Sequence, residues 1–295
     1  MTTSLQPFMP DLIDPVRVFG EKSFDFSRQV IVMAIINRTP NSNLDPHKSM
    51  ELDSIVTRAE QVMTEGADWI DIGGRAFVGV KEQLPVREEI ARVMPAIAAI
   101  REKTDAVISV DTHLPDVAIA AHEAGAHIIN DTYGLQSPGM VEVIAETGMG
   151  VIIAHSLAGP GIHIEKPDYE TGVTKEVTEF LRSRVDYALN SGIKPHQIII
   201  DPGHDLHKNT YHSNELSRNF DEIAKIGYPA LAAVSNKHFI WESIGCQRGD
   251  MEVGPGTLAA NILCVYQGAR LVRVHDVKSN VQAMRTTEAL LGLKR

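Results

Sequence analysis

Short apolar runs alternate with longer amphipathic stretches along almost the whole chain. Stretches such as Ser49–Glu65, Val86–Arg101 and Thr174–Ser191 have the spacing of amphipathic helices. The apolar runs are rich in β-branched residues and predict strands that are buried on both faces of a parallel sheet. They are Val30–Ile36, Trp69–Ile72, Ala106–Val110, His127–Asn130, Gly150–Ala154, Gln197–Ile200, Ala230–Val234 and Ala269–Val274.

This alternation favours an α/β fold, a closed (β/α)8 TIM barrel that forms a single domain over residues 29–295. A doubly wound open sheet is the alternative, and it normally carries a glycine-rich phosphate turn after its first strand. Here the first strand is followed by NRTP at residues 37–40, which contains no such turn. Prolines interrupt any helical pattern in residues 1–28, which we expect to form an N-terminal extension, as a short β-hairpin or a plug under the barrel.

Polar side chains follow the predicted strands where they end. A barrel carries its chemistry at the C-terminal ends of its strands. Carboxylates and amides beside lysine, arginine and histidine suit a polar heterocycle next to an anion. The residues at these positions are Asn37, Asp71, Asp111, Asn130, Asp131, His155, Asp201, Ser235, Asn236, Lys237, Arg273 and His275.

Part of this set is suited to a planar ring with a donor–donor edge, such as an amino-pyrimidinone. A carboxylate accepts such an edge through two hydrogen bonds, and Asp201 and, more remotely, Asp111 supply carboxylates. Asn130 supplies a donor and an acceptor, and Lys237 supplies a donor to a ring carbonyl.

Another part is suited to an anion. Arg273 and His275 alternate along the last strand and therefore point to the same side of it. Together with Asn37 they are expected to hold a diphosphate and its magnesium ion.

From about residue 30 to about residue 280 the strand-end motifs resemble those of the dihydropteroate synthase family. NRTPNSN at residues 37–43 is similar to the family's opening motif N-x-T-P-D-S-F, and SNKHFI at residues 235–240 to its S-R-K-S-F motif. DIGG at 71–74, SVDT at 109–112, IND at 129–131, DPG at 201–203 followed by Lys208, and RVHDV at 273–277 match in the same order.

The resemblance implies a folate-pathway transferase that joins 6-hydroxymethyl-7,8-dihydropterin diphosphate to p-aminobenzoate and releases diphosphate. The pterin would be bound by Asp111, Asn130, Asp201 and Lys237, and the catalytic residues would be Asp111, Lys237, Arg273 and His275. Asn37, Arg273 and His275 would bind the diphosphate, with Asn37 also a ligand of Mg²⁺. A cytoplasmic homodimer is implied as well, with the final helical stretch, Val277–Leu291, suited to its interface.

The pocket for the second substrate departs from the family's pattern. Asn236 stands where the family has an arginine that stacks over the aromatic amine, and His238 where it has a serine that receives the carboxylate. The family's second loop reads GGESTRPG, and GGRAFVG at residues 73–79 lacks its anion-binding arginine. We expect Arg75 or Arg38 to take the place of this arginine. This pattern is similar to the divergent second copies of the family in actinobacteria. The pocket residues are Thr39, Pro40, Asn41, Arg75, Leu206, Asn236 and His238.

Three functions stay open on the sequence. The first is condensation of the pterin diphosphate with p-aminobenzoate or another amine. The second is a non-catalytic or repurposed pterin-binding protein, which the altered pocket favours. The third is a corrinoid-linked pterin methyltransferase, which has no use for Arg273 and His275 and ranks last.

Composition excludes several other classes. The net charge of -10 argues against a general nucleic-acid binder, which needs a basic face. Cys246 and Cys264 have no CxxC spacing, and therefore predict neither a zinc site nor a disulfide framework. We expect neither a signal peptide nor a membrane span. The histidine-rich stretch His204, His207 and His212 is expected to be a solvated loop rather than a metal site.

Overall fold

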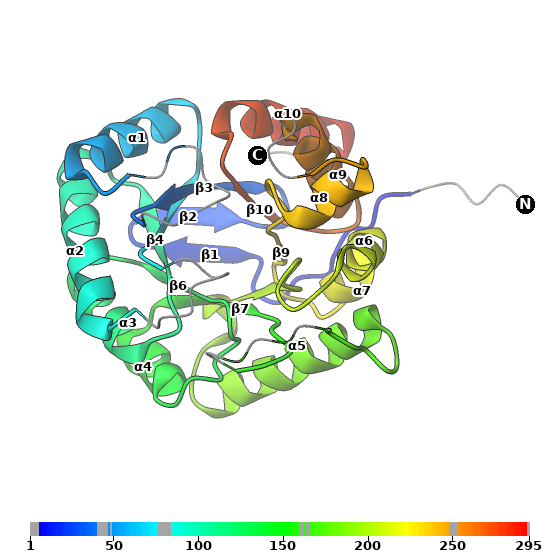
Figure 1. Ribbon diagram of the computed structural model, residues 1–295, viewed down its shortest axis with the longest axis horizontal. Helices are drawn as coiled ribbons and strands as arrows, with labels where there is room; N and C mark the ends of the chain where they lie inside the picture. The colour runs from blue at the N-terminus through cyan, green and yellow to red at the C-terminus, as the bar shows by residue number, and fades with distance from the viewer. Residues whose placement is uncertain are drawn as a thin grey trace, which may run out of the picture.

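In the computed structural model, parallel strands follow one another around a ring, with helices outside it (Figure 1). The structure describes residues 6–39, 47, 49–75, 84–159, 162, 164, 166–247 and 253–293. Its eight-stranded sheet has the order β8-β7-β6-β5-β4-β3-β10-β9, so neighbours in the chain are neighbours in the ring. The predicted single-domain (β/α)8 barrel is confirmed. Its strands are β3 (Ile31–Asn37), β4 (Trp69–Gly73), β5 (Val107–Asp111), β6 (Ile128–Asp131), β7 (Gly150–Ala154), β8 (Ile198–Asp201), β9 (Leu231–Ala232) and β10 (Leu271–Val274).

Each predicted strand corresponds to one of these, with its ends at most two residues from the predicted ones. The largest difference is at Ala230–Val234, where β9 is much shorter than predicted. Between β8 and β9 the described residues form a single bridge, Ile200 with Ala230, next to a bond of 3.0 Å from the N–H of Ile200 to the carbonyl of Pro229. This seam is the least hydrogen-bonded one in the ring.

The helices cover the outward faces of the strands. In α5, the buried residues Val173, Val177, Leu181 and Val185 recur every four positions and form one apolar stripe. These stripes and the outward strand residues make one continuous core. Among the described residues, no helix combines the length and the apolar character that a membrane span requires. The helices are α1 (Leu52–Thr64), α2 (Val86–Lys103), α3 (Pro115–Glu123), α4 (Met140–Thr147), α5 (Val173–Asn190), α6 (Thr210–Arg218), α7 (Phe220–Ala224), α8 (His238–Ser243), α9 (Gly254–Tyr266) and α10 (Val277–Leu290), with a 3-10 turn η1 (Pro195–Gln197).

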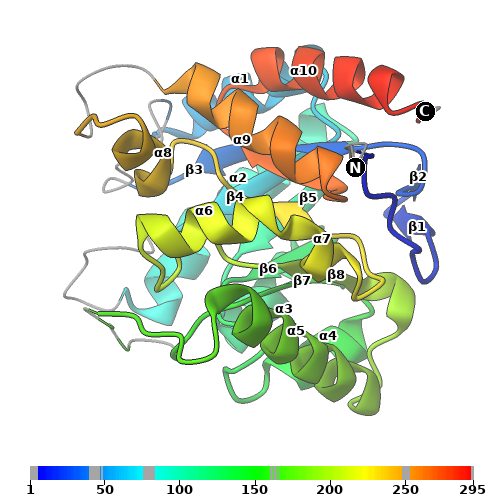
Figure 2. The same ribbon diagram turned by 90° about the vertical axis from the view of Figure 1, so that its right-hand side faces the viewer.

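A hairpin of β1 (Val16–Phe19) and β2 (Lys22–Asp25) closes the end of the barrel at which the strands begin. Phe19 and Phe24 pack edge to face against Trp69, with ring centroids 5.1 and 5.5 Å apart. With Phe26 they join the inward-facing strand residues in a second core. Figure 2 shows the hairpin at one end of the barrel and α8 at the other.

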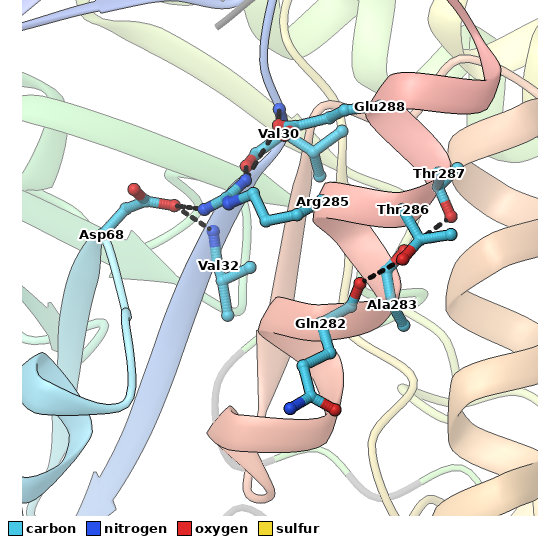
Figure 3. Close-up of polar contacts among 9 residues, drawn as sticks. All are labelled: Val30, Val32, Asp68, Gln282, Ala283, Arg285, Thr286, Thr287 and Glu288. Atoms are coloured by element: carbon cyan, nitrogen blue, oxygen red, sulfur yellow. Dashed lines mark hydrogen bonds and ion pairs between the residues drawn. The ribbon is translucent and has the colours of Figure 1, made fainter.

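Helix α10 is bonded to the start of β3 by two charged side chains (Figure 3). Glu288 Oε1 accepts the N–H of Val30 at 2.5 Å and Arg285 Nη1 at 2.8 Å. Arg285 Nη2 also donates to Asp68 Oδ2 at 2.8 Å, and the same oxygen accepts the N–H of Val32 at 2.9 Å. The last helix therefore supplies hydrogen bonds that the first barrel strand does not obtain from its neighbours.

We expect Glu288→Ala to lower the free energy of unfolding by about 1–3 kcal/mol, because the buried N–H of Val30 and Arg285 lose their acceptor. Urea unfolding followed by circular dichroism measures this loss. The control is Glu60→Ala, which removes an exposed glutamate from α1 and should change the stability by less than about 0.5 kcal/mol. Equal losses in the two variants would contradict the role of Glu288.

Candidate functional site

The side chains inside the barrel change from apolar to polar along the strands. Side chains alternate between the two faces of a strand, so residues two apart point the same way. One inward layer is apolar and contains Met33, Trp69, Val107, Ile128, Ile199 and Leu271. Two residues further along the same strands stand Ile35, Asp71, Ser109, Asn130, Asp201 and Arg273. A mostly polar layer therefore lies on the apolar one, toward the C-terminal strand ends.

Asp71 is the centre of a hydrogen-bonded cluster in this layer. Its Oδ2 accepts Arg273 Nε at 2.6 Å and Asn130 Nδ2 at 3.3 Å. Arg273 Nη2 donates to Asp111 Oδ2 at 3.0 Å, so one guanidinium joins carboxylates from two adjacent strands. The Asp71 side chain is 0% exposed, and Arg273 is the cation that compensates its charge. The structure therefore brings Asp111, Asn130 and Arg273 together around Asp71, a strand-end residue that had no role in the predicted pterin and diphosphate sites.

Asp201, the last residue of β8, and Lys237, which follows β9, lie on opposite sides of the weakly bonded seam. Asp201 Oδ1 accepts the N–H of Gly203 at 2.7 Å, and Lys237 Nζ donates to the carbonyl of His204. Gly203 has a φ of +68°, and a Cβ there would lie 2.2 Å from the carbonyl oxygen of His155, so only glycine fits. The turn that orients Asp201 therefore depends on the DPG motif.

Burial dominates the electrostatics of these residues. It raises the pKa of Asp111 to about 7, against the opposing charge of Arg273 and with a further rise from Asp71. Burial also raises the pKa of Asp201 and lowers the pKa of Lys237, and the charge of each residue opposes the shift of the other. The pocket thus holds groups whose charged forms are costly until a ligand pairs with them.

A raised carboxyl pKa has a defined effect on stability. The folded state binds the Asp111 proton more tightly than the unfolded state, so its stabilising contribution is complete below about pH 4 and is lost as the pH rises through about 7. We therefore expect the free energy of unfolding to fall less between pH 5 and pH 8 in Asp111→Asn than in the wild type. Urea unfolding at both pH values tests this. Burial also raises the pKa values of Asp201 and Asp131, so a weaker dependence of the unfolding free energy on pH should remain in the variant. A steeper slope in the variant would contradict the assignment.

Asn37 and His275 flank this cluster. Asn37 ends β3 in register with Gly73, which is in register with Asp111. A Cβ on Gly73 would lie 2.8 Å from Asn37 Oδ1, so the glycine leaves room beside this oxygen. His275 directly follows β10, is buried, and has Nδ1 2.9 Å from Ser235 Oγ. An amide oxygen near a carboxylate fits Mg²⁺, which usually takes one or two protein ligands and completes its shell with phosphate oxygens and water. Within the described residues no group of three or more His, Cys, Asp or Glu side chains could hold a metal ion.

The positions predicted for the second substrate are only partly described, because Pro40 and Asn41 lie outside the described residues. Thr39 and Leu206 are buried. Asn236 is half-buried with a φ of +54°, and His238 is exposed at the start of α8.

The two arginines considered as anion ligands have partners within the protein. Arg75 Nε donates to Glu89 Oε2 at 2.8 Å, and Arg75 Nη2 to the carbonyl of Leu84 at 2.6 Å. Arg38 donates to the carbonyls of Met50 and Arg92. Both guanidinium groups are therefore already hydrogen-bonded to other parts of the protein.

Comparison with known proteins agrees with this geometry. The family model described as "Pterin binding enzyme" matches residues 33–275. The chain belongs to the pterin-binding enzyme family. The "Inactive dihydropteroate synthase 2" of Mycobacterium leprae is 36% identical over 271 residues, covering 90% of this chain and 91% of the relative. The dihydropteroate synthase of Escherichia coli strain K12 is 35% identical over 263 residues, covering 89% and 92%. The solved dihydropteroate synthase of Xanthomonas albilineans in complex with 7,8-dihydropteroate superimposes with a TM-score of 0.79 at 32% identity, covering 94% of this chain and 98% of that one.

In this pterin-binding enzyme, the expectation that the histidine-rich loop between β8 and α6 is solvated is wrong for one residue. His204 is fully buried rather than solvated. Its ring stacks on Phe239 and lies parallel to Phe220, with centroids 5.7 and 6.3 Å away, and its Nε2 is 3.1 Å from Ser217 Oγ. The aromatic residues that bury it come from α7 and α8, so the loop sequence by itself did not indicate them.

The same loop holds a buried lysine that the predicted site omitted. Lys208 Nζ lies 2.8 Å from His155 Nδ1 and donates to the carbonyl of Leu206 at 3.1 Å. Burial lowers the pKa of this lysine well below its ordinary value, while the charge of Asp201 raises it. The signal that could have found Lys208 was its place in the DPG loop motif. For Asp71 the signal was its position two residues after Trp69, which places both side chains inside the barrel.

Proposed function

We propose that this protein is a transferase of the dihydropteroate synthase type. It condenses 6-hydroxymethyl-7,8-dihydropterin diphosphate with an amine and releases diphosphate. The observation that carries this proposal is the cluster of Asp71, Asn130, Arg273 and Asp111 beside Asp201, at the C-terminal strand ends of a barrel that matches named synthases over about nine-tenths of its length.

The pterin binds through its polar edge. Asp201 accepts the donor pair of the amino-pyrimidinone ring, and burial makes this charge-assisted pairing strong. Asn130 supplies a donor and an acceptor, and Lys237 donates to the ring carbonyl. Asp111, ionised beside Arg273, stabilises the positive charge that develops on the pterin when diphosphate leaves.

Arg273 and His275 bind the leaving diphosphate together with Asn37. Two N–H groups of Arg273 serve Asp71 and Asp111, and a guanidinium has three more to donate. Mg²⁺, when bound at Asn37, would supply charge neutralisation at the diphosphate oxygens. The amine then forms its bond to the exocyclic carbon and loses a proton. This sequence needs no covalent intermediate with the enzyme.

A non-catalytic pterin-binding protein is the second candidate. It is favoured by the altered positions Asn236 and His238 and by the name of the Mycobacterium leprae relative. Incubation with the pterin diphosphate and magnesium, with and without p-aminobenzoate or other amines, separates the two functions. Amine-dependent release of diphosphate supports the transferase, and pterin binding without release under any condition supports the second candidate.

We further propose that the protein acts as a homodimer in the cytoplasm. Leu290 of α10 is 82% exposed, and Ile262 and Leu263 of the adjacent α9 are also exposed. This apolar surface supports an interface formed by the last two helices. Light scattering would measure the mass, and Leu290→Glu should shift it toward the monomer.

A further inference from the structure

Asp205 holds a carboxylate in a fixed position in the loop between β8 and α6. Residues 203–217 and 235–247, which follow β8 and β9, form the part of the rim of the proposed pocket that includes Asp205. Its φ of +60° is unusual for a residue with a side chain. The backbone N–H of Asp205 donates to Ser213 Oγ at 3.1 Å, and this hydroxyl donates to Asp205 Oδ1 at 3.2 Å. The other oxygen, Oδ2, accepts the N–H of His238 at 2.6 Å. The carboxylate therefore bridges α6 and the first turn of α8.

This carboxylate is adjacent to the proposed pterin pocket. His238 directly follows Lys237, and Lys237 Nζ donates to the carbonyl of His204, the residue before Asp205. The charges of Asp201 and Asp205 both oppose the lowering of the Lys237 pKa by burial. Asp205 therefore lies beside the residues proposed to hold the pterin that the amine attacks.

The positive charges of this part of the rim offset the charge of Asp205 only in part. A second carboxylate, that of Glu242, has Oε1 3.8 Å from His238 Nδ1 and accepts the hydroxyl of Thr210. The two lysines of residues 203–217 and 235–247 both bond inside the protein, Lys208 to His155 and Lys237 to His204. In these described segments the rim is negative.

We propose that Asp205 determines the class of the second substrate, and that this class is arylamines without a carboxylate, with cationic ones preferred. The inference rests on the proposed function. His238 has no hydroxyl to replace that of the serine that receives the substrate carboxylate in the family, and its backbone N–H already binds the carboxylate of Asp205. An anionic amine would meet an occupied donor and a like charge, whereas a cationic amine would meet a counter-charge.

Three amines of matched shape test the proposal. They are 4-aminobenzoate, 4-aminobenzamide and 4-aminobenzamidine, which are anionic, neutral and cationic. We expect kcat/KM for diphosphate release to favour the amidine over the benzoate by at least about tenfold in the wild type. Saturation-transfer NMR of each amine, with the protein loaded with pterin diphosphate and magnesium, gives the order of binding without turnover.

Substitutions at Asp205 should remove the preference. Asp205→Asn keeps the shape and tolerates the positive φ, and Asp205→Gly relieves the strain and frees the N–H of His238. Each should shift the ratio toward 4-aminobenzoate by about tenfold or more. The control Glu242→Gln removes a rim charge that does not contact this N–H, and should shift the ratio by less than about threefold.

The outcomes separate the inference from the function it rests on. A wild type that prefers 4-aminobenzoate, an Asp205→Asn ratio equal to that of the wild type, or equal shifts in Asp205→Asn and Glu242→Gln would overturn the inference but not the function. Pterin binding without release by any amine overturns the function, and the NMR order then decides whether Asp205 selects the ligand. If no amine binds, or no pterin, the inference is wrong.

Discussion

Asp201→Asn should lower the affinity for 6-hydroxymethyl-7,8-dihydropterin diphosphate by about 30-fold to several thousand-fold, as expected when one partner of a buried, charge-assisted pair is lost (about 2–5 kcal/mol). The carboxamide offers one acceptor and one donor, and therefore opposes one of the two donors on the ring edge. Isothermal titration calorimetry with the pterin diphosphate and magnesium measures the loss.

The same variant carries its own control for folding. Asn retains an oxygen to accept the N–H of Gly203. Burial already raises the pKa of Asp201 and thus penalises its charge, so the neutral side chain should leave the urea midpoint unchanged or higher. Wild-type affinity in a folded Asp201→Asn protein would remove Asp201 from the pterin pocket.

Arg273→Met should abolish turnover and destabilise the protein by about 3–5 kcal/mol, because it leaves the buried carboxylate of Asp71 without its cation. The neighbouring Asp111 loses the same partner. Urea unfolding of the variant, with the far-ultraviolet circular dichroism signal as the readout, measures the destabilisation.

A second substitution tests whether the buried charge is the cause. The double variant Arg273→Met with Asp71→Asn removes both charges and retains an acceptor for Asn130 Nδ2. It should recover at least half of the lost stability but none of the activity. If the double variant is as unstable as the single one, the loss reflects packing rather than charge compensation.

The fold was predictable from the sequence because each strand is a short apolar run with a polar residue at or near its C-terminal end. The predicted and observed strands differ most at β9, where pairing across the seam with β8 is reduced to the bridge of Ile200 with Ala230. Strand length there depends on the neighbouring strand, and the local pattern contains no information about that pairing. The placement of the proposed pocket residues was predictable for the same reason, since it follows from where the strands end.

The partners of those residues were much less predictable. Arg273 was expected to bind an anion, yet its Nε bonds to Asp71, which lies 202 residues earlier in the chain. His204 was expected to be solvated, and it is enclosed by rings that follow it in the sequence. Local sequence specifies which groups stand at a strand end, whereas closure of the ring decides which of them meet.

The aromatic hairpin closes the barrel at the end where its strands begin. Phe19, Phe24 and Phe26 fill the end where the strands start, so we expect substrates to enter at the end that carries Asp111 and Asp201. The proposed pterin pocket lies below the rim, and Asp205 lies on it. Both reactants would then enter at the same end, and the more deeply bound pterin diphosphate would have to bind before the amine. Steady-state kinetics should therefore follow a compulsory order, with the pterin diphosphate as leading substrate and the amine, at high concentration, slowing its escape.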